Sequence, residues 1–490
     1  MDKSEKRILK PELRPLVMSA VEAASKIKSN MVVATSGFGT GYPKAIPTAL
    51  AESKHAKDLV YINGAARGEK HIGAMSGAGI LKRGYGFQAD STMRTAINNG
   101  EIYYTDIHLG LFVDKIRHGD FGHIDVAVIE CSSIKEDGSL VPTMSAGITE
   151  VIAELADTIL IEINEDLPIE IEGFHDYGVP EGAIIKSPSQ RLGVPFIKID
   201  ADKIAGIVFT NEPDTDLSYP ESTELYDRLS ANVLDVLKRE IENGGIPEQF
   251  TFQSGMGIVA NLVLVGLVGQ GLKGLKMYTE VVSDQALFAV REGIISEVTT
   301  TTLDITPIGF EDLYNNLSFF KEHIVLRPLN ITNGAAKILA QELVSINTAW
   351  EADIYGNINS THAMGVRLVN ALGGSNDFAR NAKLAIFTSP STTKSDTISR
   401  IVPMVPHVDN SEHDVDILVT ECGYADLRGL APKERVAEII ENCAHPDYRQ
   451  QLWDYYNGAL DICGPVQTPH NLKKCFDWYQ RYLETGTMKE

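Results

Sequence analysis

The sequence predicts an α/β protein made of two tandem open domains with mostly parallel sheets. Apolar runs rich in β-branched residues alternate with amphipathic helical stretches along almost the whole chain. Near-continuous Val and Ile strands separated by helices are typical of parallel sheets that are covered on both faces. Residues 211–224, rich in Pro, Asp and Ser, indicate a linker. We therefore expect domains at 1–215 and 225–490.

The individual elements follow from hydrophobic periodicity. Short apolar runs bounded by turn residues predict strands at 31–35, 59–63, 126–129, 158–163, 204–209, 384–387 and 417–420. Apolar positions at helical spacing predict helices at 16–28, 46–53, 225–243, 334–345 and 431–442.

Composition excludes several classes of partner. The 490 residues contain 44 Lys and Arg against 66 Asp and Glu, a balance of 44 − 66 = −22. No basic cluster offers a footprint for nucleic acid or for an anionic membrane surface, so neither is an expected partner. An acidic chain that binds an anion needs local cations or backbone N–H groups.

Targeting signals and cysteines point to a cytoplasmic protein. The N-terminus has no secretory pattern, and the most apolar window, 257–269, is shorter than the ~20 residues that span a bilayer. The five cysteines are odd in number and lack C-x-x-C spacing, which is typical of buried residues in a reducing compartment.

The sharpest local motif covers residues 253–281. A short strand leads to Gly255-x-Gly257-x-x-Ala260, then to a small-residue helix and to a strand over 275–279 that ends at Glu280. This pattern satisfies the dinucleotide fingerprint, and it equally fits a βα turn with no ligand. Glu280 could accept a ribose hydroxyl, act as a covalent nucleophile, or be a plain strand-end carboxylate.

Two other glycine-rich loops are candidate anion sites. Glycines at 37, 39 and 41 precede Pro43 and Lys44 at the start of a predicted helix, although the loop is not a P-loop. Residues 359–381 contain Gly373-Gly374-Ser375. Backbone N–H groups on such turns can hold an oxyanion, or the glycines can serve the turn alone.

The segment 407–414, HVDNSEHD, imitates a metal-ligand cluster but lacks a known ligand spacing, so we expect a solvated acidic turn and no metal. Tyr455 and Tyr456, near Trp453, are expected to pack on a C-terminal helix.

Longer motifs resemble those of a known family. They are MYTEV (277–281), VLRPLNITN (325–333), ADIYGNINSTHAMG (352–365), LGGSNDFARNAKLAIF (372–387), the segment 401–435 and NCAHPDYR (442–449). Over nearly all its length the chain resembles the acetyl-CoA hydrolase/transferase family of class I CoA-transferases.

The resemblance implies two CoA-transferase domains with the active site in the cleft between them, in a homodimer. It implies that Glu280 is the catalytic glutamate, which becomes a glutamyl-CoA thioester. Asn333 and Glu421 match other active-site positions, and the Gly374 N–H matches an oxyanion donor. Positions that match CoA contacts are Gly255, Met256, Gly257, Ile258, Val259, Asn370 and Gly374.

The implied activity is transfer of CoA between a short-chain acyl-CoA and a free acid of the acetate, propionate, butyrate or succinate class. CoA is then a substrate, and no tightly bound cofactor is expected. Departures such as GMGIVANLV, where the family usually reads GVGNIANAV, affect the CoA contacts and leave Glu280 in place. Alternatives are acyl-CoA hydrolysis at the same site, an NAD-dependent dehydrogenase built on 255–260, and a silent acyl-CoA binder.

Overall fold

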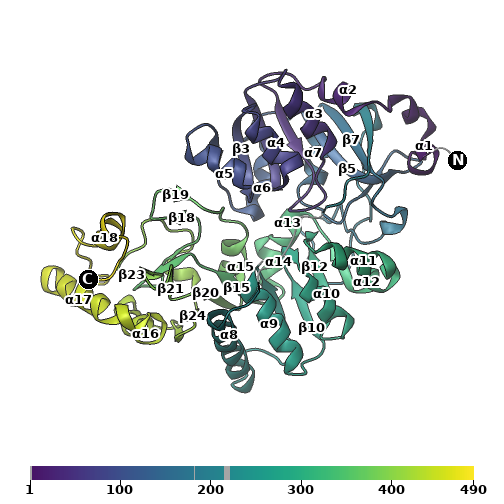
Figure 1. Ribbon diagram of the computed structural model, residues 1–490. Coiled ribbons are helices and arrows are strands. Elements are labelled where there is room, and N and C mark those ends of the chain that lie inside the picture. Colours follow the sequence, from purple (N-terminus) through teal and green to yellow (C-terminus); the bar gives the residue numbers. More distant parts are fainter. Residues whose placement is uncertain (1–2, 181, 215–220, 256) are drawn as a thin grey trace. The chain divides into compact units, whose positions relative to one another are not determined.

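The computed structural model describes residues 3–180, 182–214, 221–255 and 257–490, and the chain divides into two compact units. Unit 1 comprises Met1–Ser218, Lys276–Arg291 and Ile295–Gln341, and unit 2 comprises Tyr219–Leu275, Glu292–Ile294 and Glu342–Glu490. Figure 1 traces them in sequence colours. The segment around Glu280 thus clusters with the N-terminal part of the chain. The boundaries at 215 and 225 stay a prediction from sequence.

Unit 1 is built on a sheet in the order β4-β3-β2-β1-β5-β7-β8, with β6 paired to β5. The seven strands of this path are parallel, and only β6 is antiparallel to its neighbour. They are β1 (Val32–Thr35), β2 (Leu59–Ala66), β3 (Leu81–Gln88), β4 (Tyr103–Thr105), β5 (Val126–Ile134), β6 (Leu140–Pro142), β7 (Thr158–Asn164) and β8 (Ile204–Thr210).

This strand order reverses between β1 and β5. From β1 the chain builds outward through β2, β3 and β4, and it then returns to place β5 on the other side of β1. In open α/β sheets, ligands bind outside the carboxyl ends of the strands at such a switch point. The loop that leaves β1 carries Gly37, Gly39 and Gly41, so the fold places the first glycine turn at this position.

Helices cover both faces of the sheet (Figure 1). Because side chains alternate along a strand, Val33 packs in one core cluster and Ala34 in another. The first cluster includes residues of α2 (Ala20–Ala24), α3 (Ala45–Ser53), α4 (Ala74–Gly77) and α5 (Ser91–Asn98). The second includes residues of α6 (Leu109–Arg117) and α7 (Thr149–Leu155).

The later segments of unit 1 carry Glu280. They form β10 (Leu275–Tyr278), β11 (Val281–Val282), α10 (Asp284–Arg291), β12 (Ile295–Thr300), β13 (Thr302–Leu303), α11 (Pro307–Asn315), α12 (Leu317–His323), β14 (Ile324–Leu326), α13 (Leu329–Thr332) and α14 (Ala335–Leu339). After β14, the fully buried Arg327 pairs with the fully buried Asp176 at 3.0 Å. Its guanidinium also donates to the Pro188 carbonyl at 2.8 Å, which fixes that loop against β14.

Unit 2 contains the parallel run β9 (Thr251–Ser254), β15 (Val344–Thr348), β20 (Leu384–Thr388) and β24 (Ile417–Thr420), closed by the antiparallel β25 (Gly423–Asp426). Its helices are α8 (Glu224–Glu242), α9 (Ile258–Gly269), α15 (Ser375–Asn381), α16 (Pro432–Cys443), α17 (Pro446–Cys463) and α18 (Asp477–Thr485). Tyr455 and Tyr456 lie on α17 and contribute to the core of this unit, as predicted.

All seven predicted strands are present, and the helices expected at 46–53, 225–243 and 431–442 are confirmed. The expectation at 16–28 was too long, because α2 begins after a capping box at Ser19 and ends at Ala24. The expectation at 334–345 was wrong at its end. The helix α14 stops at Leu339, Glu342 adopts φ 47°, and Val344 already pairs in the sheet.

The described ranges contain no helix that combines the length and the apolar character needed to cross a membrane.

A small sheet of unit 2 contains a buried acid. Glu351 lies on β16 (Glu351–Asp353), which pairs with β17 (Ile358–Asn359) and β23 (Ile401–Val402). The Asn359 amide donates to Glu351 Oε1 at 2.7 Å. Burial raises the pKa of Glu351 to about 7, and the Asn359 hydrogen bond and the Arg400 charge only partly oppose this.

This raised pKa predicts a pH-dependent stability. Between about pH 4.5 and 7 the folded chain keeps the Glu351 proton that the unfolded chain has lost, so the free energy of unfolding falls as the pH rises. Glu351→Gln should remove this contribution of up to about 3 kcal/mol, seen as a flatter dependence in urea titrations from pH 5 to 8. The exposed Glu438→Gln is the matched control and should keep the wild-type slope. Parallel curves for wild type and Glu351→Gln would contradict the prediction.

Candidate active site

Glu280 lies between β10 and β11, where its backbone is held by three donors. Its carbonyl oxygen accepts from the N–H groups of Thr301 at 3.0 Å and Thr302 at 3.3 Å, and from Thr300 Oγ1 at 2.8 Å. The next residues pair in parallel, Val281 with Thr302 and Val282 with Leu303. The side chain of Glu280 is half-buried, on a backbone that has little freedom to move.

Asn333 contacts the Glu280 carboxylate directly. The Asn333 amide donates to Glu280 Oε1 at 2.7 Å, and its own Oδ1 accepts from Thr332 Oγ1 at 2.8 Å. Asn333 is buried at the end of the short helix α13. The structure thus brings together two residues that were each predicted as active-site positions. A neutral amide orients the carboxylate without neutralising it, which suits a carboxylate that acts as a nucleophile.

The glycine turn after β1 lies against the segment that follows Glu280. Thr40 Oγ1 and Thr302 Oγ1 are 2.9 Å apart, and a Cβ at Gly39 would lie 3.6 Å from Asp304 Oδ2. The turn is tight, since Gly41 has φ 66° and a Cβ there would come within 2.1 Å of Thr143 Oγ1. The two segments therefore form one local group within unit 1.

This turn has fewer N–H groups to offer an oxyanion than the sequence suggested. The N–H of Phe38 donates to the Thr40 carbonyl, that of Gly39 to the Ala65 carbonyl, and that of Gly41 to Asp214 Oδ2. The remaining candidate donors from the turn are the N–H groups of Gly37 and Thr40.

A buried cluster of charged residues contacts the end of the glycine turn that follows β1. Lys44 Nζ contacts Glu130 Oε1 at 2.9 Å, Asp214 Oδ1 at 2.7 Å and the Tyr42 carbonyl at 2.9 Å. The Glu162 carboxylate accepts from the backbone N–H groups of Lys44, Ala45 and Ile46, and so caps α3. Since Asp214 also accepts from Gly41, the Lys44 ammonium fixes the end of the glycine turn through that carboxylate.

The protonation of this cluster follows from its charges. Burial alone would lower the pKa of Lys44, but the Asp214 and Glu130 charges raise it above its usual value. Burial raises the pKa of Glu130 to about 8 despite Lys44, with Asp214 and Glu162 adding to the effect. Burial and the neighbouring carboxylates thus favour the protonated form of Glu130, and the Lys44 ammonium only partly opposes them.

In unit 2, the predicted CoA-contacting positions start helix α9. Gly255 follows β9 and donates to the Ile346 carbonyl at 3.2 Å, and Gly257 adopts φ 132° just before the helix. Ile258 and Val259 form its first turn. Apart from the two chain neighbours of Gly257, no atom of the described residues lies within 4 Å of a Cβ built at this position. Met256 lies outside the described residues.

The other predicted residues of unit 2 lie on loops. Gly374 directly precedes α15, after Gly373 with φ 63°, and the Asn370 N–H donates to the Thr361 carbonyl at 3.4 Å. Glu421 follows β24 and is only 9% exposed. Its carboxylate accepts from the Ser391 N–H at 2.8 Å and from the Ser391 hydroxyl. Glu421 is therefore a carboxylate held in place within its own unit.

Sequence reasoning missed three features of unit 1. The threonines that hold Glu280, Thr300–Thr302, lie in the run TTTTLD, whose polar, β-branched residues could have marked a strand end. Asp304 is the last residue of that run and forms an ion pair with Arg67. The sequence alone did not show whether Arg67 lies near the site. Asp214 and Glu162 join Lys44 from distant segments, and no local pattern shows this.

No group of three His, Cys, Asp or Glu suited to a metal was found among the residues that the structure describes. In the 407–414 segment, Asp409 accepts hydrogen bonds from the Ser360 N–H and from the Thr361 hydroxyl, so its carboxylate serves to hold a loop.

The chain matches two sequence-family models. Residues 1–209 match the acetyl-CoA hydrolase/transferase N-terminal domain, and residues 309–456 match the C-terminal domain of the same name.

Full-length relatives are similar throughout. The chain is 40% identical to the succinyl-CoA:acetate CoA-transferase of Clostridium kluyveri, over 99% of this chain and 92% of the relative. It is 37% identical to an acetyl-CoA hydrolase of Schizosaccharomyces pombe, over 97% and 96%. It is 36% identical to the propanoyl-CoA:succinate CoA transferase of Escherichia coli, over 96% and 98%.

Solved structures share the fold. RipA from Yersinia pestis matches with a TM-score of 0.72 at 21% identity, covering 94% of this chain and 98% of that one. A 4-hydroxybutyrate CoA-transferase from Porphyromonas gingivalis matches with a TM-score of 0.65 at 24% identity, covering 90% and 97%. Both confirm the α/β fold class.

The Lys44 cluster yields a stability prediction. Lys44→Met leaves buried carboxylates without their cation, and we expect a loss of about 3–5 kcal/mol. The loss should be smaller at pH 5 than at pH 8, because protonation of the carboxyls relieves the unpaired charge. Thermal and urea unfolding at both pH values measure it.

The control is Lys70→Met, which breaks a surface ion pair with Glu212 in the same unit, where the side chains are 61% and 40% exposed. That change should cost about 1 kcal/mol or less. Equal losses in the two variants would refute the view that the Lys44 cluster supports the turn.

Proposed function

The chain belongs to the acetyl-CoA hydrolase/transferase family, and from this premise we propose that it transfers CoA between a short-chain acyl-CoA and a free carboxylic acid through a covalent intermediate on Glu280. The observation that carries the proposal is the Glu280 carboxylate oriented by the buried Asn333 on a fixed backbone. Relatives named as CoA-transferases support the enzyme class. The family also favours this interpretation over a dinucleotide site at 255–260.

The reaction starts with attack of the Glu280 carboxylate on the carbonyl of the acyl-CoA. CoA leaves as the thiolate, and an acyl-glutamyl anhydride forms. The thiolate then attacks the glutamyl carbonyl, which releases the first acid and leaves a glutamyl-CoA thioester. A second acid reverses these steps and leaves as its CoA ester, so the reaction is of the ping-pong type.

Each tetrahedral intermediate carries an oxyanion that backbone N–H groups can stabilise. We propose the Gly374 N–H for this role, as the family resemblance implies, with the N–H groups of Gly37 and Thr40 as further candidates. Asn333 holds the carboxylate in its reactive position, and Glu421 is proposed as a further active-site acid. The N-terminal turn of α9, with Gly255–Val259, and Asn370 are proposed to contact CoA.

Acyl-CoA hydrolysis at the same site is the second candidate, since several relatives, including the yeast protein above, are named acetyl-CoA hydrolases. In a hydrolase, water would take the place of the second acid, and free CoA would form without an acceptor. A cytoplasmic homodimer stays a prediction from sequence.

The test is replacement of the nucleophile. Glu280→Gln keeps the size and the Asn333 contact but cannot form the thioester, so acid-dependent CoA exchange should fall by at least about 10⁴-fold. Wild-type protein incubated with acetyl-CoA should show CoA attached to the peptide that contains Glu280, by mass spectrometry.

Glu292→Gln, an exposed position on the same stretch of chain, is the control and should keep wild-type exchange. Turnover that survives in Glu280→Gln would overturn the assignment. Release of CoA by the wild type at the same rate with and without an acceptor acid would establish the hydrolase instead.

A further inference from the structure

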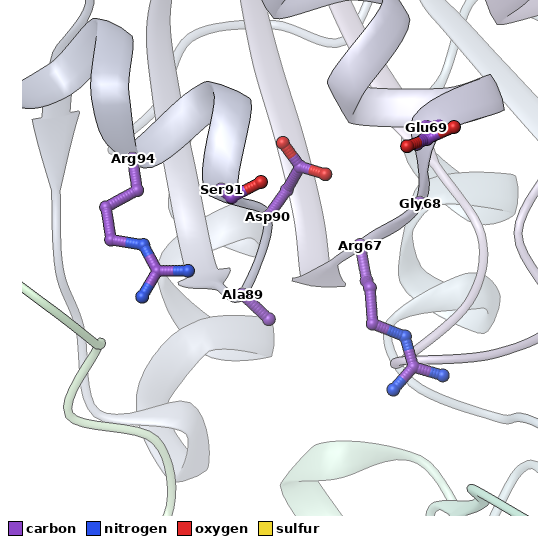
Figure 2. A pocket seen from close by; sticks show the side chains of 7 residues that line it. All are labelled: Arg67, Gly68, Glu69, Ala89, Asp90, Ser91 and Arg94. Atoms are coloured by element: carbon purple, nitrogen blue, oxygen red, sulfur yellow. The ribbon is translucent and has the colours of Figure 1, made fainter. Parts of the chain in front are cut away.

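A cavity of about 370 Å³ lies at the carboxyl ends of β2 and β3 (Figure 2). Its lining comes from the two segments that follow these strands. Arg67 directly follows β2, and Ser91 and Arg94 lie on helix α5, which comes after β3. Its volume lies within the ~300–1,000 Å³ typical of small-molecule sites. The two arginines extend toward the same side of the strand ends in Figure 2, with Ala89 between them.

From this arrangement we propose that Arg67 binds the distal carboxylate of a dicarboxylic acceptor acid, and that it selects four-carbon diacids such as succinate over monoacids. The inference rests on the proposed function, because it names the substrate class of the same reaction.

The guanidinium of Arg67 is preoriented. Its Nη1 and Nη2 donate to the two carboxylate oxygens of Asp304, at 2.9 and 2.7 Å. This end-on pair uses two of the five N–H donors and leaves the Nε side of the planar fork for a second carboxylate. The Arg67 side chain is 24% exposed, whereas that of Asp304 is 7% exposed. Asp304 thus holds the arginine, and the arginine is the partner that solvent reaches.

The same strand pair fixes Arg67 relative to Glu280. The Asp304 N–H donates to the Val282 carbonyl at 2.9 Å, one step beyond the paired residues of β11 and β13. Asp304 therefore directly follows the short strand β13, whose partner β11 begins directly after Glu280. The arginine that Asp304 holds is thus tied to the strand pair that starts directly after Glu280, and the proposal places the distal carboxylate of the diacid at this arginine.

The acidic residues of the cavity do not compete for Arg67. Asp90 is buried, and its Oδ1 accepts from the N–H groups of Thr92 and Met93, so it caps helix α5. Glu69 is exposed at the rim. The carboxylate of a bound acid thus adds to Arg67 a second charged hydrogen-bond acceptor beside Asp304.

The experiment compares acceptors in a steady-state exchange assay with acetyl-CoA or propionyl-CoA as donor. In Arg67→Gln, the ratio of the KM for succinate to the KM for a monoacid (propionate with acetyl-CoA, acetate with propionyl-CoA) should rise about 10- to 100-fold, the loss expected for a charge-assisted contact. Arg67→Lys keeps the charge without the fork and should fall between wild type and Arg67→Gln. Arg83→Gln is the control, because Arg83 lies on β3 with its guanidinium over the Tyr103 ring, and its ratio should stay at the wild-type value.

The outcomes separate the hypotheses. An unchanged ratio in Arg67→Gln, or a rise in the KM for acyl-CoA alone, overturns the inference, and the latter would assign the arginine to a phosphate of CoA. If Arg67→Gln fails to fold with Asp304 unpaired, the double variant Arg67→Gln/Asp304→Asn removes that buried charge and is scored by the same ratio. A wild type that exchanges CoA with no acid refutes the proposed function itself. A wild type that uses monoacids but not succinate refutes only the inference.

Discussion

The parallel pairing of Val281–Val282 with Thr302–Leu303 is the contact on which the site of unit 1 depends. It follows Glu280 immediately, and the turn before β13 supplies the donors that hold the Glu280 carbonyl. The same short strand brings Thr302 to Thr40 and Asp304 to Arg67. A single short strand thus connects Glu280, the glycine turn and Arg67 within unit 1. Because the side chains that matter sit on strand ends, they are positioned more precisely than flexible loops would allow.

Buried charge provides the second level of support. The Lys44 cluster and the Arg327–Asp176 pair both lie beside loops that leave the sheet, and both place ions where desolvation is costly. Such groups add little net stability compared with apolar residues of the same size. Their benefit is specificity, since each ion must find its partners, and only one arrangement of the Gly41 N–H, Asp214 and Lys44 satisfies them together. Because these contacts hold the Gly41 N–H, they restrict a turn whose glycines would otherwise allow several conformations.

Much of the fold could be predicted, because it depends on local pattern. Runs such as 126–129 and 158–163 are apolar on both faces, and this alone identifies buried parallel strands. Predictions from hydrophobic periodicity were wrong where tertiary contacts determined the secondary structure. Val344 continues a helical periodicity, yet it pairs with both β9 and β20. In the site, Glu280 and Asn333 were identified through long motifs, whereas Asp304, Asp214 and Glu162 were not. These three acids contact residues that are 237, 173 and 118 positions away in the sequence. Hydrophobic periodicity is a local pattern and cannot predict contacts over such separations.

The net charge of −22 limits how this protein can recognise an anionic substrate. An acidic protein that acts on anionic substrates cannot attract them by its overall field, so recognition depends on single placed cations. Arg67 illustrates how this works. Its pairing with Asp304 cancels its charge at long range, so it adds little to the field that steers ions. At hydrogen-bond distance, however, the remaining donors of the guanidinium still distinguish a carboxylate from a neutral end group. A paired arginine therefore gives selectivity for the shape and the charge of the acid, and it costs the chain no exposed positive patch.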